Sequence, residues 1–189
     1  MQNVNEALVG VTGAIYSFAT DSLLEYGVNG ALPVAHVDHG FASEDGVTVN
    51  GSRSTTNIFA WQNATLVRTV TTEASVTYKF TLIQVNEANA ELYYGRKKNS
   101  ITGAVHWDPA VSAGKRSFVI DVIDPSVDKK VRYFIPSGEV TEIGEQNIVS
   151  SGLVSYNLTI TAYKETIQGT DEPANTLIWD GPATEEDAS

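Results

Sequence analysis

The sequence predicts a mainly β protein, an antiparallel β-sandwich or barrel with one short flanking α-helix. Three observations lead to this prediction. Strand-like segments recur between turn signals along the chain, and Thr and Val are abundant while Leu is modest. Only one stretch has the composition and caps of a helix. A chain of 189 residues is most simply one domain, large enough to bury a core.

The segment 74–95 joins the clearest strand to this helix. Apolar and polar residues alternate from Ala74 to Leu82, which is typical of a strand with one buried and one hydrated face. Asn86 is a favourable helix N-cap, the stretch 87–94 is rich in helix formers, and Gly95 suits a left-handed C-cap. Because two turns of helix are unstable alone in water, we expect this helix to pack on the sheet.

The chain is expected to open with an arm or edge strand over residues 1–18, followed by a loop from 21 to 44. Asn50-Gly51 is a favoured hairpin dipeptide, so a short strand at 47–49 is expected to turn there. We expect the region 40–56 as a whole to form an extended loop or hairpin. Further strands are expected at 57–61, 66–72 and 74–85.

After the helix, alternation and turn residues predict five more strands. Pro136-Ser137-Gly138 is expected as a turn, and Gly144 as the site of a kink or bulge. We expect a single domain over residues 1–169 and an acidic tail over 170–189, which also carries the apolar side chain of Trp179. The predicted strands are 101–107, 117–124, 130–135, 139–148 and 154–164.

Composition excludes several function classes. A net charge of −11 disfavours nucleic-acid binding through phosphate neutralisation. The absence of Cys removes disulfides, thiolate catalysis and Cys-based metal sites. His36 and His39 have a spacing that metal ligands use, but no second ligand pair follows, so we expect solvated or interface histidines and no metal. No catalytic constellation, cofactor motif or apolar run of membrane-spanning length is found, so we expect neither an enzyme nor a membrane protein.

Three groups of segments follow one another in order over roughly residues 30–165. The first group is Leu32-Pro33 with HGFASEDGVT at 39–48. The second is AWQ at 60–62, LVRTV at 66–70, FTLIQ at 80–84 and ELYYG at 91–95. The third is RSFVIDVID at 116–124, IPSGEVTE at 135–142 and YNLTITA at 156–162. Together these segments resemble the major tail protein (tail tube) family of long-tailed non-contractile phages, the siphophages, especially those of actinobacteria. Gln84 departs from the acidic residue that this resemblance leads us to expect there.

The resemblance implies a β-sandwich related to the tube subunit of type VI secretion, and a structural role in the virion. Copies are expected to form hexameric rings, assembled in the host cytoplasm and stacked into the conduit for genome ejection. Implied partners are further copies of the chain, the tape measure, tail terminator and distal tail proteins, and double-stranded DNA that passes without specific binding. A net acidic wall suits this role, because a wall that attracted phosphates would retain the DNA.

On this interpretation the polar side of the long strands is expected to line the lumen, and charged or aromatic groups are expected to join subunits. The region 40–56 is then expected to reach an adjacent subunit. The acidic tail is expected to meet basic loops, unless both are simply solvated. The candidate lumen residues are Ser75, Thr77, Lys79, Thr81, Glu142, Glu145, Asn157 and Thr159. The candidate inter-subunit residues are Glu44, Asp45, Arg53, Arg96, Lys97, Lys98 and Trp179.

The alternative function is a β-sandwich carbohydrate-binding or adhesion module of a phage or cell surface. That function predicts an exposed aromatic platform and often an Asp-rich calcium loop. The sequence has three dispersed Trp residues and no such loop, and glycan binding would distinguish the two functions.

Overall fold

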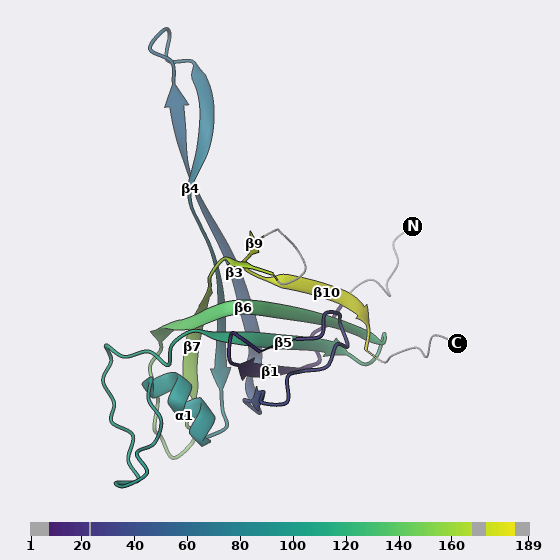
Figure 1. The fold of residues 1–189 in the computed structure, drawn as a ribbon, viewed down its shortest axis with the longest axis vertical. Coiled ribbons are helices and arrows are strands. Elements are labelled where there is room, and N and C mark those ends of the chain that lie inside the picture. The colour runs from purple at the N-terminus through teal and green to yellow at the C-terminus, as the bar shows by residue number, and fades with distance from the viewer. Residues whose placement is uncertain (1–7, 23, 168–172, 184–189) are drawn as a thin grey trace.

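The computed structural model describes residues 8–22, 24–167 and 173–183 of the chain, and it confirms the mainly β, antiparallel class with one flanking helix (Figure 1). The helix α1 spans Glu87–Tyr94. The longer strands are β1 (Thr12–Phe18), β3 (Ala42–Phe59), β4 (Leu66–Leu82), β5 (Arg116–Asp124), β6 (Lys129–Ile143), β7 (Tyr156–Ala162) and β10 (Leu177–Pro182). The short strands are β2 (Val37–Asp38), β8 (Glu165–Thr166) and β9 (Pro173–Ala174).

The strands form two layers that share β6. The first half of β6 pairs with β5, which pairs with β1, and β10 lies on the other side of that half. The second half, from Gly138, pairs with β7, followed by β4 and β3. Strands β1, β5 and β6 run across the view of Figure 1, whereas β3, β4 and β7 run up it. The two layers therefore pack at a steep angle, as in orthogonal sandwiches.

The core fills the space between these layers. Tyr78, Phe80 and Leu82 are buried there, which confirms the alternation predicted for this strand. Leu92 and Tyr93 of α1 pack against the same cluster, so the short helix is held by the sheet from which it emerges. The partners from the other strands are Ile15, Phe118, Ile120, Ile135, Tyr156, Leu158 and Ile160.

A second, smaller cluster covers the outer side of the first layer. Val119 and Phe134 are buried there with Phe18, beneath Leu24 and Leu32 of the loop before β2. Strand β5 is therefore covered on both faces, as its two apolar faces predict.

The helix caps are confirmed in detail. The Asn86 side chain accepts a hydrogen bond from the Asn89 backbone N–H at 2.7 Å, and Gly95 ends the helix with φ 73°. A Cβ atom at position 95 would lie 2.0 Å from the Val111 carbonyl oxygen, so the position requires glycine on steric grounds as well.

The predicted turn at Asn50-Gly51 is wrong. Strand β3 runs straight through both residues, because Asn50 pairs with Thr77 and Gly51 with Val76 of β4. The strands expected at 57–61 and 66–72 are the distal parts of β3 and β4, and residues 60–65 form the turn. Trp61 is 98% exposed at that turn.

Three expectations in the second half of the chain are also wrong. Residues 136–138 form no turn but lie inside β6, where the strand passes between layers and Pro136 occupies a break in the register with β5. Residues 101–107 form a loop, and Trp107 packs its ring against Tyr94. Strand β6 ends at Ile143, and its bulge lies between Val140 and Glu142 rather than at Gly144.

Candidate assembly and lumen surfaces

The candidate lumen residues of two separate strands lie on one face of the second layer. Thr77 of β4 lies opposite Thr161 of β7, Lys79 opposite Thr159, and Thr81 opposite Asn157. The Thr81 hydroxyl donates to the Asn157 side-chain carbonyl, which links the two strands on this face. The sequence predicts candidate residues on both strands, and the structure combines them in a single surface, which we call the polar face.

The polar face is wider than the sequence predicted. Strand β3 adds Thr48 opposite Lys79, Asn50 opposite Thr77 and Ser52 opposite Ser75. These residues were missed because a turn was expected at Asn50, although their own period-2 alternation of polar side chains was visible. Four strands in the order β6-β7-β4-β3 therefore present a surface of hydroxyl and amide groups.

The charged groups of this face lie mainly toward β6. Glu142 is opposite Thr159, which is itself opposite Lys79, so the carboxylate and the ammonium belong to one cross-strand row. Two strand spacings separate their backbones by about 10 Å. Glu145 lies just beyond β6, and its backbone carbonyl accepts from the Asn157 side chain at 2.9 Å. Within the described part of the chain, no three His, Asp or Glu side chains gather as a metal site.

Both edges of this four-stranded layer are open. Strand β3 ends the strand order, so its outer edge has no partner strand in the described chain. Beyond Gly138, the second half of β6 pairs only with β7 among the described strands. Among the described residues, each edge therefore presents backbone N–H and C=O groups that face no neighbouring strand.

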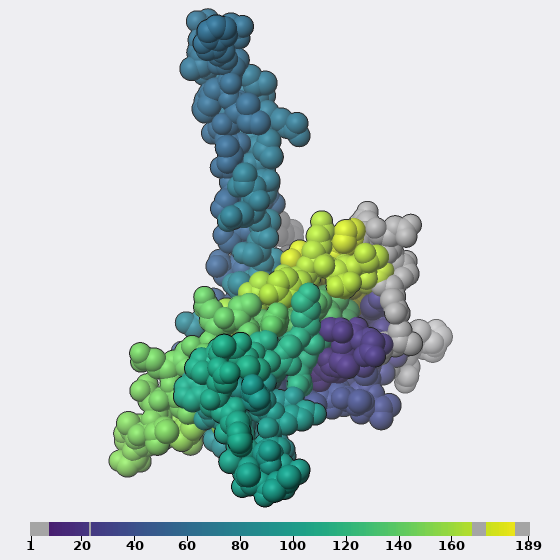
Figure 2. Space-filling model, turned by 60° about the vertical axis from the view of Figure 1, so that its left-hand side comes forward, coloured from purple at the N-terminus to yellow at the C-terminus, as the bar shows by residue number. Residues whose placement is uncertain are grey.

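The distal parts of β3 and β4 form a two-stranded ribbon, residues 53–59 and 66–74, that projects from the body (Figures 1 and 2). Strand β4 pairs with β7 only from Val76 onward, so the ribbon has no third strand among the described residues. All ribbon side chains except that of the half-buried Val70 are exposed. Isolated two-stranded ribbons are marginally stable in water, so this element calls for an external partner.

The candidate inter-subunit residues occupy separate places. Glu44 and Asp45 lie in a stretch of β3 where pairing with β4 is interrupted, and Arg53 begins the ribbon. Residues 96–98 lie on an exposed loop after α1. Trp179, expected as an exposed anchor, instead packs within its own chain: its ring stacks on Phe134 at 6.3 Å between centroids. This occurs because part of the segment expected as a tail forms β10, which pairs with β6.

The histidine expectation is wrong for His39, which is fully buried. The Asn89 amide nitrogen donates to the His39 and Gln84 carbonyls, so its oxygen accepts from His39 Nδ1 at 2.7 Å. Nε2 is then the acceptor of the Ser17 hydroxyl at 2.8 Å. Burial lowers the pKa of His39, and the nearby Arg116 acts in the same direction. The imidazole is a structural link between β1 and α1.

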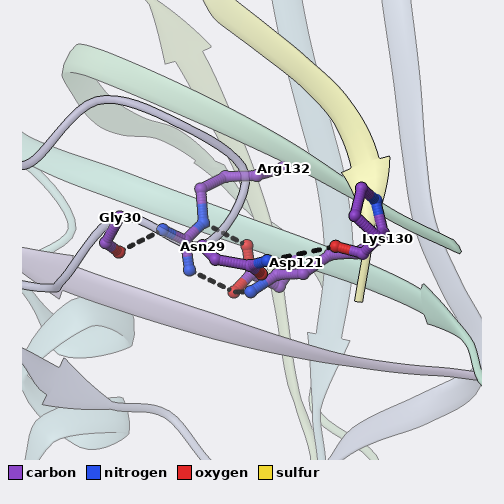
Figure 3. A network of polar contacts seen from close by, with 6 residues as sticks. Asn29, Gly30, Asp121, Lys130 and Arg132 are labelled. Atoms are coloured by element: carbon purple, nitrogen blue, oxygen red, sulfur yellow. Dashed lines mark hydrogen bonds and ion pairs between the residues drawn. The ribbon is translucent and has the colours of Figure 1, made fainter. Parts of the chain in front are cut away.

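A buried ion network, shown in Figure 3, fixes the outer side of the first layer. Asp121 accepts from Arg132 Nε at 2.7 Å and Nη2 at 2.8 Å, and Lys130 Nζ lies 3.1 Å from the same carboxylate. Arg132 Nη1 also donates to the Gly30 carbonyl, and the Asn29 amide donates to Pro182 of β10 at 3.1 Å. The network ties a loop and the last strand to the sheet. The signal in the sequence was an acid, Asp121, and a base, Arg132, on two neighbouring predicted strands.

A family model described as phage tail tube protein matches residues 1–185. A chain of the anti-feeding prophage baseplate is 9% identical with a TM-score of 0.46, and the match covers 94% of this chain and 97% of that one. A chain of the sheath-tube complex of an extracellular contractile injection system is 9% identical with a TM-score of 0.42, covering 93% of both. A chain of the native gene transfer agent virion is 12% identical with a TM-score of 0.34, covering 75% and 89%.

The search of curated proteins finds no match. Within the described residues, no helix has the length and apolar character needed to span a bilayer.

Proposed function

Because the chain belongs to the phage tail tube protein family, and is thus a structural virion component, we propose that its copies close into hexameric rings that stack as the tail tube of a siphophage. The polar face is then the wall of the conduit through which the genome leaves. The role requires no catalysis. On this proposal the tape measure protein occupies the lumen, and terminator and distal tail proteins meet the tube ends.

The observation that supports ring closure most directly is the pair of open edges on one layer. Strand β3 of one copy can pair with the second half of β6 of the next, since each lacks a partner on that side in the described chain. Repetition of this pairing continues the four-stranded layer from copy to copy until the ring closes. Closure then removes the exposed edges.

The chemistry of the polar face supports passage rather than capture of DNA. Hydroxyl and amide groups of Thr77, Thr159 and Asn157 keep water at the surface, and the chain carries a net charge of −11. Lys79 is the one cation among the candidate lumen residues, and Glu142 lies in its row. A repeated cationic wall would retain DNA through many phosphate contacts, whereas this wall offers few.

Negative-stain electron microscopy of the purified chain tests the proposal. Rings or stacked tubes are expected at high protein concentration or after addition of tail initiator proteins. A sample that stays monomeric under both conditions, while circular dichroism shows a folded β protein, would contradict it.

A further inference from the structure

The sandwich has an open side between β1 and the beginning of β3, which we call the mouth. It has a volume of about 540 Å³ and is lined by residues 10–15, 40–47 and 120–122. The opposite side is closed because β6 belongs to both layers. Core residues Ile15 and Ile120 reach this opening, and the apolar side chains of Val11 and Phe41 are 60% and 75% exposed at its rim. Exposed apolar surface of this kind more often marks a binding site than a surface that contacts only solvent.

Both lips of the mouth are strand edges that lack a neighbour. Strand β2 pairs with β1 only at Tyr16 and Ser17, and the Ile15 carbonyl accepts from the His39 N–H at 3.0 Å, so residues 12–14 have no strand partner on that edge among the described residues. On the other lip, pairing between β3 and β4 is interrupted from Ser43 to Gly46. Gly46 on the second lip has open space where a Cβ atom would lie, which permits close approach of another chain, whereas the bare Cα of Gly13 faces the Asp121 carbonyl of β5 in its own chain.

The ribbon has an amphipathic character that its own chain does not use. Ile58, Arg68 and Val70 share one face with Thr56, because Ile58 pairs with Arg68 and Thr56 with Val70. The opposite face carries polar side chains only over the same length: Thr55, Asn57, Thr69 and Thr71. Phe59, Trp61, Leu66 and Val67 add exposed apolar surface at the tip. An element patterned in this way is built to lay one face on another surface.

We propose that the ribbon face with Ile58, Arg68 and Val70 seats against the mouth of a second copy, with Arg68 beside Glu44 and Asp45. The inference rests on the proposed function and names the surface that receives the ribbon. Charge complementarity selects this occupant, since both acids line the mouth and Arg68 has no ion-pair partner in the described chain. The ribbon projects from its own body, so the partner mouth belongs to another molecule (Figure 2). Such a contact is heterologous, and where its repetition does not close into a ring it extends an open polymer.

Cysteine pairing tests this contact without background, because the chain contains no Cys. A chain with Ile58→Cys is mixed with a tagged chain carrying Val11→Cys, tubes are grown, and a short thiol cross-linker is added. A heterodimer is expected in good yield. The control is Asn57→Cys, on the opposite face of the ribbon, which should give several-fold less product.

The outcomes separate this inference from the proposed function. Tubes that form without the heterodimer, or that give equal product from both ribbon positions, would overturn the ribbon contact and leave the tube assignment in place. Absence of any polymer from the unmodified chain would overturn both.

Charge exchange provides an independent test. Arg68→Glu alone, and the pair Glu44→Lys with Asp45→Lys alone, should each raise the concentration required for polymerisation by about fivefold. An equal mixture of the two variants should polymerise almost as the original chain does, because each mouth then meets a ribbon of opposite charge. Failure of the mixture to recover, with both variants folded by circular dichroism, would contradict the proposed pairing.

Discussion

Replacing Asp121 by Asn should be among the most damaging single changes in the chain. The carboxylate is bound by Arg132 Nε and Nη2 and by Lys130, and the Arg132 side chain is only 4% exposed. Asn preserves the shape of the side chain but removes its charge. Two cations would then share a buried site without a counter-charge, and Arg132 would lose the partner that orients it toward Gly30.

Breaking a buried ion pair from one side costs about 3–5 kcal/mol of unfolding free energy, because the remaining charge is left without compensation. The free energy of unfolding of a domain is typically about 5–15 kcal/mol, so this loss is a large share of the total. For a chain of this length, it corresponds to a fall in Tm of roughly 6–20 °C. Lys130 lies close to the vacated position, but it carries the same sign as Arg132 and cannot replace the lost charge.

Urea unfolding followed by circular dichroism measures this free energy, with Asp180→Asn on an exposed face of β10 as the matched control. The control should change stability by less than about 0.5 kcal/mol. Arg132→Met combined with Asp121→Asn should recover part of the loss, since the unpaired guanidinium is then gone. A loss below about 1 kcal/mol for Asp121→Asn alone would refute the reasoning that the network is desolvated and energetically important.

Three further predictions follow from other parts of the chain. Burial lowers the pKa of His39, so below about pH 6.5 the unfolded state binds more protons than the folded state, and the free energy of unfolding should fall by up to about 1.4 kcal/mol for each unit by which the pH is lowered. His39→Gln should remove that part of the shift in urea midpoint between pH 7.5 and 5.5. Identical shifts in both proteins would contradict the prediction. Gly95→Ala should destabilise the fold by more than about 2 kcal/mol in urea unfolding, because the left-handed φ and the Val111 carbonyl both oppose a Cβ atom; a loss under about 0.5 kcal/mol would show that the loop simply moves. Thr77→Arg combined with Thr159→Arg should leave tubes intact in micrographs but make them retain double-stranded DNA at low salt in a filter-binding assay. Thr77→Gln combined with Thr159→Gln is the uncharged control. Equal retention of DNA by the two double variants would argue that these residues do not face the lumen.

The features predicted correctly from sequence are those that local physics determines. The alternation from Val76 to Leu82 identifies the buried side of β4, since a strand has a strict period of two. The helix is bounded by Asn86 and Gly95 because capping depends on backbone geometry within a few residues. The polar residues of β4 and β7 were identified for the same local reason.

The features that were missed depend on pairing between distant segments. Asn50-Gly51 favours a turn by itself, but continuous pairing of β3 with β4 over many residues outweighs that preference. Strand β6 crosses between layers at Pro136, and only its two sets of partners show why it does not turn there. The burial of His39 requires Ser17 and Asn89, which lie in separate segments of the chain.

The open edges and the ribbon are difficult to explain in a protein that acts as a monomer. Long unpaired edges such as that of β3 are sites of uncontrolled association, and soluble proteins usually blunt them with charge, bulges or short length. Here the body section of β3, from Val47 to Ser52, carries no charged residue and is exposed everywhere except at Val47, where it is half-buried. On the proposed contact, the chain instead places the two surfaces on separate elements, the ribbon and the mouth, so that a second copy brings them together. A protein with such exposed edges avoids aggregation only if the intended partner is abundant. A subunit that pairs with further copies of itself meets this condition.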